Sequence, residues 1–262
     1  NTELASGGAA AININGALAG AGNNDNLTIN SAGITTINGV ITGIRNLETN
    51  ATGTTVIAAN ISSDGTQTYN DAVEISGADR TLTTTGDAVF FDGTVNSAAG
   101  QTRGLTVAAG AGLTTFDAEV GGSVGVGAIA ITGAGGLDLN ADIGNTDPSA
   151  GATSLVVTGA TDLGGNVTTT DLQTYTGAVT LSGATRTLTS SGGSTITFGN
   201  TIDGTQALNV NTAGTTVFNG NVGSGTALGA IDIVTGAFDL NANITSAASL
   251  DVNSTTALGG NI

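Results

Sequence analysis

The chain of 262 residues contains 43 Gly, 1 Pro and no Cys, His, Trp or Met, and only 9% of its residues are charged, against roughly 25% in an ordinary soluble domain. Acidic residues outnumber basic ones by 20 to 4, and the formal net charge is −16. Because the chain lacks a basic stripe that could neutralise phosphates, we expect neither binding to nucleic acid nor docking on anionic lipid. The hydrophobic content of 39% is too high for a typical disordered segment.

Three absences narrow the class of protein further. A chain without Cys has no disulfide framework and no thiolate metal site, so packing and backbone hydrogen bonds must hold it together. No apolar run approaches the roughly 18 residues of a membrane-spanning helix, so we expect no direct membrane insertion. The start of the chain, Asn1-Thr2-Glu3-Leu4, lacks the basic and apolar regions of a signal peptide, which indicates a mature form or a fragment.

A long internal repeat organises the chain. Tyr69 and Tyr175 stand at equivalent places in two copies of one block, at an offset of 175 − 69 = 106 residues. The matching stretches are 67–83 with 173–189, 137–143 with 238–244, and 163–167 with 258–262. We therefore expect one segment over 1–262 built from a partial unit at approximately 1–56 and units at 57–162 and 163–262.

A shorter cassette recurs inside the long repeat: a large apolar residue, any residue, a small residue or Asn, any residue, and an aliphatic residue. Its copies start at Ile37, Ile57, Phe91, Phe116, Leu139, Leu163, Phe198, Phe218, Leu240 and Leu258. Most starts lie roughly 20 to 25 residues apart, whereas the two wide gaps, 57 to 91 and 163 to 198, each hold a Gln-Thr-Tyr block. We expect one extra turn of the repeat in each wide gap.

The cassettes alternate apolar and polar residues and are rich in Val, Ile, Thr and Phe, which is the pattern of short strands, and Asp-Gly and Asn-Gly turn signals separate them. A period near 20 is too short for a helical hairpin repeat. Tandem immunoglobulin-like sandwiches would give a repeat near 100 residues but would not repeat internally at about 20. The sequence therefore predicts an all-β fold, a right-handed parallel β-helix of roughly 20-residue coils, with roughly thirteen coils in a rod of ~60 Å.

Several side chains are expected to stack from coil to coil. One group of Asn residues shares the fourth cassette place, where either axial amide hydrogen bonds or simple turn preference explains them. Tyr69 and Tyr175 are interpreted as packing plugs rather than ligand platforms, and the six Phe residues as stacks in the lumen. The Asn residues in question are Asn60, Asn166, Asn221, Asn243 and Asn261.

The repeats also resemble those of a known class of proteins. The blocks at 67–78 and 173–184, followed by 198–202, 208–211 and 215–223, resemble the long repeats of giant bacterial surface adhesins of the filamentous haemagglutinin group and of autotransporter passengers. The resemblance extends from about Leu27 onward. It implies a secreted, cell-surface β-helical stalk involved in attachment or biofilm, or a unit of an extracellular fibre.

No catalytic, cofactor-binding or metal site is expected, and the protein is predicted not to be an enzyme. The pair Asp117 and Glu119 is replaced by Asn219 and Asn221 in the matching copy, so these carboxylates look interchangeable. Arg80 and Arg186 occupy equivalent places in the two units, which favours a structural role. No cofactor is expected, although loosely bound calcium is compatible with the acidic balance.

Three weaker signals have simpler explanations. The segment Gly20–Leu27 resembles a calcium nonapeptide but occurs once and is one residue too long, so it is interpreted as an Asn- and Gly-rich loop. The Thr-x-Thr triplets, which suggest ice binding, do not recur once per coil. Sequons are expected by chance in such a chain and leave glycosylation open; they lie at Asn26, Asn50, Asn60, Asn166, Asn243 and Asn253.

The sequence thus favours a rigid extracellular stalk or fibre segment of a large bacterial surface protein. The alternative is a filament subunit that stacks head to tail through open β-helix ends, since Asn261-Ile262 stops inside a cassette. A carbohydrate-active or ice-binding β-helix is the minor alternative. The expected partners are other copies of the chain, through end-to-end or lateral contacts, and host or matrix glycans or proteins.

Overall fold

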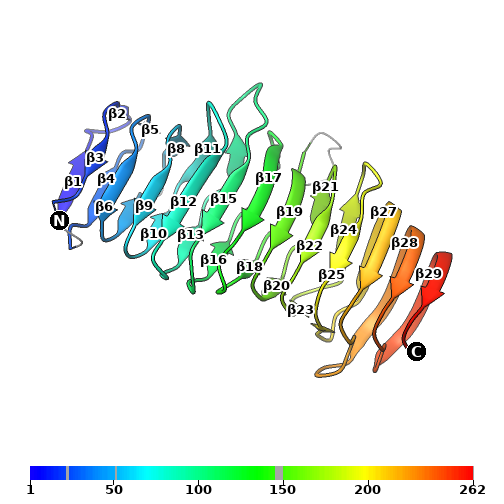
Figure 1. Cartoon of the computed structure of the whole chain (residues 1–262). Helices are drawn as coiled ribbons and strands as arrows, with labels where there is room; N and C mark the ends of the chain where they lie inside the picture. The colour runs from blue at the N-terminus through cyan, green and yellow to red at the C-terminus, as the bar shows by residue number, and fades with distance from the viewer. Residues whose placement is uncertain (22–23, 51, 145–149, 262) are drawn as a thin grey trace.

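The computed structural model describes residues 1–21, 24–50, 52–144 and 150–261. These residues form 29 strands and no helix. All the strand pairings are parallel and stack the chain into a β-solenoid of about 11 turns with about 22 residues per coil. Figure 1 shows a rod with the two ends of the chain at opposite ends. The predicted parallel β-helix is confirmed, but the estimate of thirteen coils is too high because most coils exceed 20 residues, which shortens the rod to ~50 Å.

Face 1 of the solenoid is a sheet of ten strands, one from each successive coil. Its strands are β1 (Thr2–Ala5), β4 (Leu27–Asn30), β7 (Leu47–Thr49), β10 (Gln67–Tyr69), β13 (Val89–Phe91), β16 (Thr114–Phe116), β18 (Leu137–Leu139), β20 (Thr161–Leu163), β23 (Val179–Leu181) and β26 (Ile202–Asp203). Isolated bridges continue this face through Val222 and Ile244.

Face 2 is interrupted in its middle, where single-residue bridges at Val120 and Ile143 replace full strands. Its strands are β2 (Ile12–Ile14), β5 (Ile34–Ile37), β8 (Thr54–Ile57), β11 (Ala72–Ile75), β14 (Val95–Ser97), β21 (Val167–Thr169) and β24 (Arg186–Ser190). The bridges keep the two parts of the face in one axial row.

Face 3 contains the other strand of each coil. Its strands are β3 (Leu18–Ala19), β6 (Ile41–Ile44), β9 (Ile61–Ser63), β12 (Arg80–Thr84), β15 (Leu105–Ala108), β17 (Val126–Ile131), β19 (Ala152–Val157), β22 (Gln173–Tyr175) and β25 (Ile196–Phe198). Faces 2 and 3 then merge in three long strands, β27 (Leu208–Phe218), β28 (Leu228–Leu240) and β29 (Ala247–Leu258). A register shift after Thr212 marks the corner between the two faces in β27.

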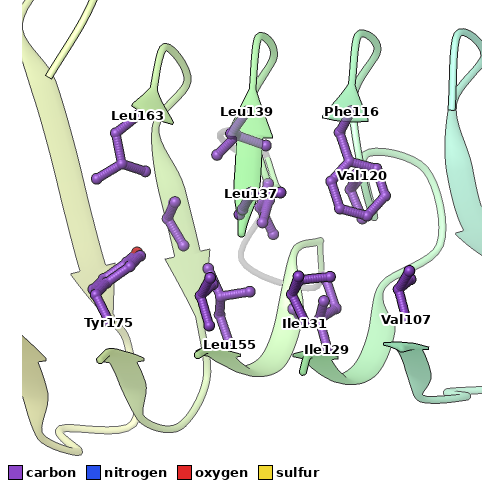
Figure 2. Packing of buried hydrophobic residues seen from close by; sticks show 14 of the residues in the cluster. Val107, Phe116, Val120, Ile129, Ile131, Leu137, Leu139, Leu155, Leu163 and Tyr175 are labelled. Atoms are coloured by element: carbon purple, nitrogen blue, oxygen red, sulfur yellow. The ribbon is translucent and has the colours of Figure 1, made fainter. Parts of the chain in front are cut away.

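Strand alternation builds the core. Most three-residue strands bury their first and third side chains and leave the middle one partly exposed. The inward side chains form one continuous apolar core that runs from Leu27 to Ile244. In Figure 2, Val107, Ile131, Leu155 and Tyr175 of face 3 lie in a row opposite the row that contains Phe116, Leu139 and Leu163 of face 1. Each coil thus buries its apolar side chains against those of its neighbours.

Aromatic rings stack along the lumen at the start of each long-repeat unit. Tyr69 lies 5.2 Å from Phe91, which lies 4.9 Å from Phe116, in near-parallel stacks. In a second series, Tyr175 stacks on Phe198, and Phe198, Phe218 and Phe238 follow in T-shaped contacts, at centroid distances of 5.1–5.3 Å. The prediction that Phe rings contact one another along the lumen is therefore confirmed for five residues. The prediction is wrong for Phe90, which is the outward residue of β13 and is partly exposed.

Equivalent parts of the long repeat lie on different faces. The first Gln-Thr-Tyr block is β10 on face 1, and the second is β22 on face 3. From β10 the chain makes four full coils to β20 on face 1, then passes β21 on face 2 and reaches β22. Each unit therefore advances about four and two-thirds coils, so successive units are rotated by one face of the three-sided solenoid.

The cassettes follow the same rotation. Those that start at Ile37 and Ile57 end strands on face 2, those from Phe91 to Leu163 end strands on face 1, and those from Phe198 to Leu258 lie on face 3. Each wide gap holds about one and two-thirds coils instead of two, so the prediction of a whole extra turn is wrong. The missing third of a coil is what moves the cassette to the next corner. The right hand of the coil stays a prediction from crossover preference.

Candidate functional site

The repeated Gln-Thr-Tyr block forms a buried polar contact inside the lumen. The Tyr69 hydroxyl donates to Gln67 Oε1 at 2.9 Å, and the Gln67 amide donates to the Thr83 carbonyl at 2.9 Å. Tyr175 and Gln173 repeat these contacts at 3.0 and 2.9 Å. Both Tyr side chains are fully buried, and burial raises the pKa of each phenol. The prediction of packing plugs is confirmed, and neither ring is accessible to a ligand.

The corner cassettes carry side-chain ladders along the rod axis. At the second cassette place, the amide of one coil donates to the side-chain oxygen of the coil before it. These bonds join Asn38 to Asn15 at 3.0 Å, Asn140 to Asp117 at 2.8 Å and Asn241 to Asn219 at 2.9 Å. Sequence analysis placed such ladders at the fourth place and missed the second.

At the fourth place, the Asn166 amide donates to Asp142 Oδ2 of the previous coil at 3.3 Å, whereas the other axial bonds of the Asn residues are of a different kind. The backbone N–H of Asn243 donates to Asn221 Oδ1 at 3.1 Å, and that of Asn261 donates to Asn243 Oδ1 at 2.9 Å. Asn60 and Asn166 accept in the same way from the backbone N–H groups of strands in the following coil. Both explanations of these residues are therefore partly correct, because the side chain serves the corner backbone and links two coils at once.

The two repeated arginines hold corner loops in place. Arg80 donates from Nε and Nη2 to the Ser76 carbonyl at 2.9 and 2.6 Å. Arg186 donates from Nε to the Ala184 carbonyl at 2.8 Å and from Nη1 to the Gly164 carbonyl. These contacts satisfy loop carbonyls and agree with the expected structural role.

Face 1 and its adjoining corner carry carboxylates that we call the acidic stripe: Asp138, Asp162 and Asp203 lie in strands, and Asp92 and Asp117 directly follow β13 and β16. Asp138 and Asp162 are direct partners in the strand register. Burial raises the pKa of Asp138, and the nearby Asp162 and Asp117 carboxylates raise it further. Burial and Asp117 likewise raise the pKa of Asp92. These four carboxylates thus lie close enough to repel one another.

One carboxylate lies inside the protein. Asp71 is buried, and it accepts hydrogen bonds from the Thr49 hydroxyl at 2.6 Å and from the Thr55 hydroxyl at 3.0 and 2.9 Å. Burial raises the pKa of Asp71, and the two Thr hydroxyls offset part of that rise. Sequence analysis missed this residue because the second unit has Gly177 in its place. The group has the contacts of a structural corner residue, with its oxygens already occupied.

Among the described residues, those that sequence analysis weighed for catalysis or metal binding do not lie together in one site. Asp117 is exposed and Glu119 partly exposed, and Asn140 bonds to Asp117. No group of three or more acidic, His or Cys side chains in the described ranges is placed to hold a metal ion. Within Gly20–Leu27, Gly22 and Asn23 lie outside the described residues, and Asp25 Oδ2 accepts from the Ala21 N–H at 3.2 Å.

A surface hollow near the C-terminal coils is lined by neutral residues. Its walls include Thr189, Asn211, Val234 and Asn253. Hydroxyl and amide groups of this kind can form hydrogen bonds but provide no acid–base pair.

Comparisons with known proteins leave the family open. No helix of the described part of the chain is long and apolar enough to cross a membrane. The resemblance to filamentous haemagglutinins and autotransporter passengers stays a prediction from repeat style. No family model, curated protein or solved structure matches the chain.

Proposed function

We propose that the chain is a rigid stalk segment of a large extracellular bacterial surface protein, which holds a binding region away from the cell or builds the matrix around it. The single observation that carries this proposal is the unbroken axial register. Face 1 pairs ten strands from ten successive coils without an intervening domain or linker. A structure in which each coil contacts its neighbours transmits length and stiffness along one axis.

The corners and the charge support the same role. Amide ladders and backbone bonds link successive coils at the corners as well as in the sheets, so the rod resists bending at its edges. The net charge of −16 keeps such rods away from anionic surfaces. Rotation by one face per long repeat also lets further units continue the solenoid with no break in the register.

Immunogold labelling of intact cells of the source organism, with an antibody against this chain, tests the proposal. The expected result is gold outside the cell at a fixed distance from the envelope, because a stalk has a defined length. Gold along continuous fibres of many subunits would favour the filament alternative. Labelling that requires permeabilised cells would contradict the proposed location.

The stiffness of the rod is tested separately on the isolated chain by small-angle X-ray scattering. The expected particle is a straight rod of ~50 Å, as about eleven strand spacings require. A compact or strongly bent particle would contradict the stalk role even if the location is correct.

A further inference from the structure

One face of the solenoid is free of charge over half the rod. From β15 through β17, β19, β22 and β25 to the second half of β27, the strands of face 3 contain no charged residue. We call this surface the neutral face. Over the same coils, face 1 carries the acidic stripe. The charge of −16 is therefore unevenly distributed around the rod.

The outward side chains of the neutral face form a flat, registered row. The row consists of Thr106, Ala130, Val156, Thr174, Thr197 and Val217, which are direct partners in successive strands. All six are half-buried, and all except Ala130 are Thr or Val, which carry β-branched methyl groups. At the edge of the face, directly before β22, Leu172 adds an exposed apolar side chain, and the exposed Asp171 beside it bounds the face.

We propose that the neutral face is the lateral docking surface for a second copy of this chain, with the two sheets packed face to face. Sheets with small and β-branched side chains pack at ~10 Å. At that separation, contact between two copies of face 1 would bring acidic stripes within about one Debye length at 0.1 M salt. Over the same coils, face 2 carries Glu119 and Asp142 directly before its bridge residues Val120 and Ile143. Face 3 is the face whose strands lack carboxylates over these coils, and Asp239 on β28, the register partner of Val217, marks the end of the neutral face.

The area of the neutral face defines how strong this contact is. Six strands span ~24 Å along the axis, and strands of three to six residues span ~10–20 Å across the face. The contact therefore buries roughly 500–1,000 Å² in total, at or below the lower limit of specific interfaces. We expect a dimer that forms at micromolar to millimolar concentrations and that strengthens as salt screens the net negative charge of the two rods.

The two Gln-Thr-Tyr blocks provide a matched pair of variants. Thr174 is the outward residue of β22 on the neutral face, and Thr68 is the outward residue of β10 on face 1; both strands have the same sequence and the same burial pattern. Thr174→Asp places like charges in the proposed interface, whereas Thr68→Asp adds the same charge at the equivalent position on another face, next to Glu48 of the neighbouring strand.

Sedimentation velocity and small-angle X-ray scattering from about 10 µM to about 1 mM test the proposal, with circular dichroism to verify that both variants are folded. The expected result is a dimer of unchanged length and greater cross-section that Thr174→Asp weakens by about tenfold or more, while Thr68→Asp retains it. A monomer throughout this range, equal effects of both substitutions, or association that doubles the length of the rod would overturn the proposal.

Discussion

Three Thr hydroxyls in the lumen provide a direct test of the core. The Oγ1 atoms of Thr114, Thr161 and Thr216 are buried and have no hydrogen-bond partner, and the side chains are at most 2% exposed. A buried hydroxyl without a partner costs about 1–3 kcal/mol. Val has the same branched shape and replaces the hydroxyl by a methyl group, whose burial is favourable. Each Thr→Val substitution should therefore raise the free energy of unfolding by about 1–2 kcal/mol.

The three effects should add. Thr114 and Thr161 lie two coils apart on face 1, at ~9.5 Å, and Thr216 lies on face 3. Sites at such separations are usually independent, so the triple variant should gain about 3 kcal/mol or more. The assay is urea denaturation followed by circular dichroism, with the midpoint compared at equal slope.

The matched controls are Thr49→Val and Thr55→Val. Their hydroxyls donate to buried Asp71, so the same chemical change should destabilise the protein by about 1.5–3 kcal/mol, the range for a hydrogen bond to a charged group. A triple variant no more stable than the parent, or controls that are equally stabilising, would refute the assignment of the three lumen hydroxyls as unsatisfied.

Three further predictions concern pH, close packing and the polar plug. Because burial raises the pKa of Asp71 in the folded state above its ordinary value of 3.8, the folded protein binds a proton more readily than the unfolded chain, so stability should rise as pH falls through the folded-state pKa and level off below the ordinary value; Asp71→Asn should flatten this dependence of the urea midpoint. Gly220→Ala should cost about 1–3 kcal/mol by overpacking, because its Cβ would lie 2.1 Å from the backbone of the previous coil, whereas Gly16→Ala, which meets nothing within 4 Å, should leave the melting temperature unchanged. Tyr175→Phe should lower the free energy of unfolding by about 1–3 kcal/mol, as measured by urea denaturation, because it removes the hydroxyl that donates to buried Gln173.

The sequence predicts the local contacts of this fold better than it predicts the face of the solenoid on which each repeat unit lies. Cassette spacing and alternation identified the parallel solenoid, and the duplicated tyrosines and arginines were correctly interpreted as structural. Asp71 and the ladder at the second cassette place were missed, because a residue present in one unit alone gives no repeat signal. Phe90 was assigned to the lumen from its residue type, although alternation beside buried Val89 and Phe91 already pointed it outward.

The face on which each unit lies could not be predicted, because the coil length is not constant. Along face 1, the step between registered residues is long from Thr2 to Leu27 and short from Thr161 to Val179, since corner loops differ in length while the strands must stay paired. Dividing a repeat of about 106 residues by an average coil length therefore does not show that each unit ends one third of a turn short of five coils. That third decides which surface each unit presents. The cassette determines how a corner is built, whereas the loop lengths of the whole unit determine on which face it lies, and hence where the charged and the neutral faces of the rod are found.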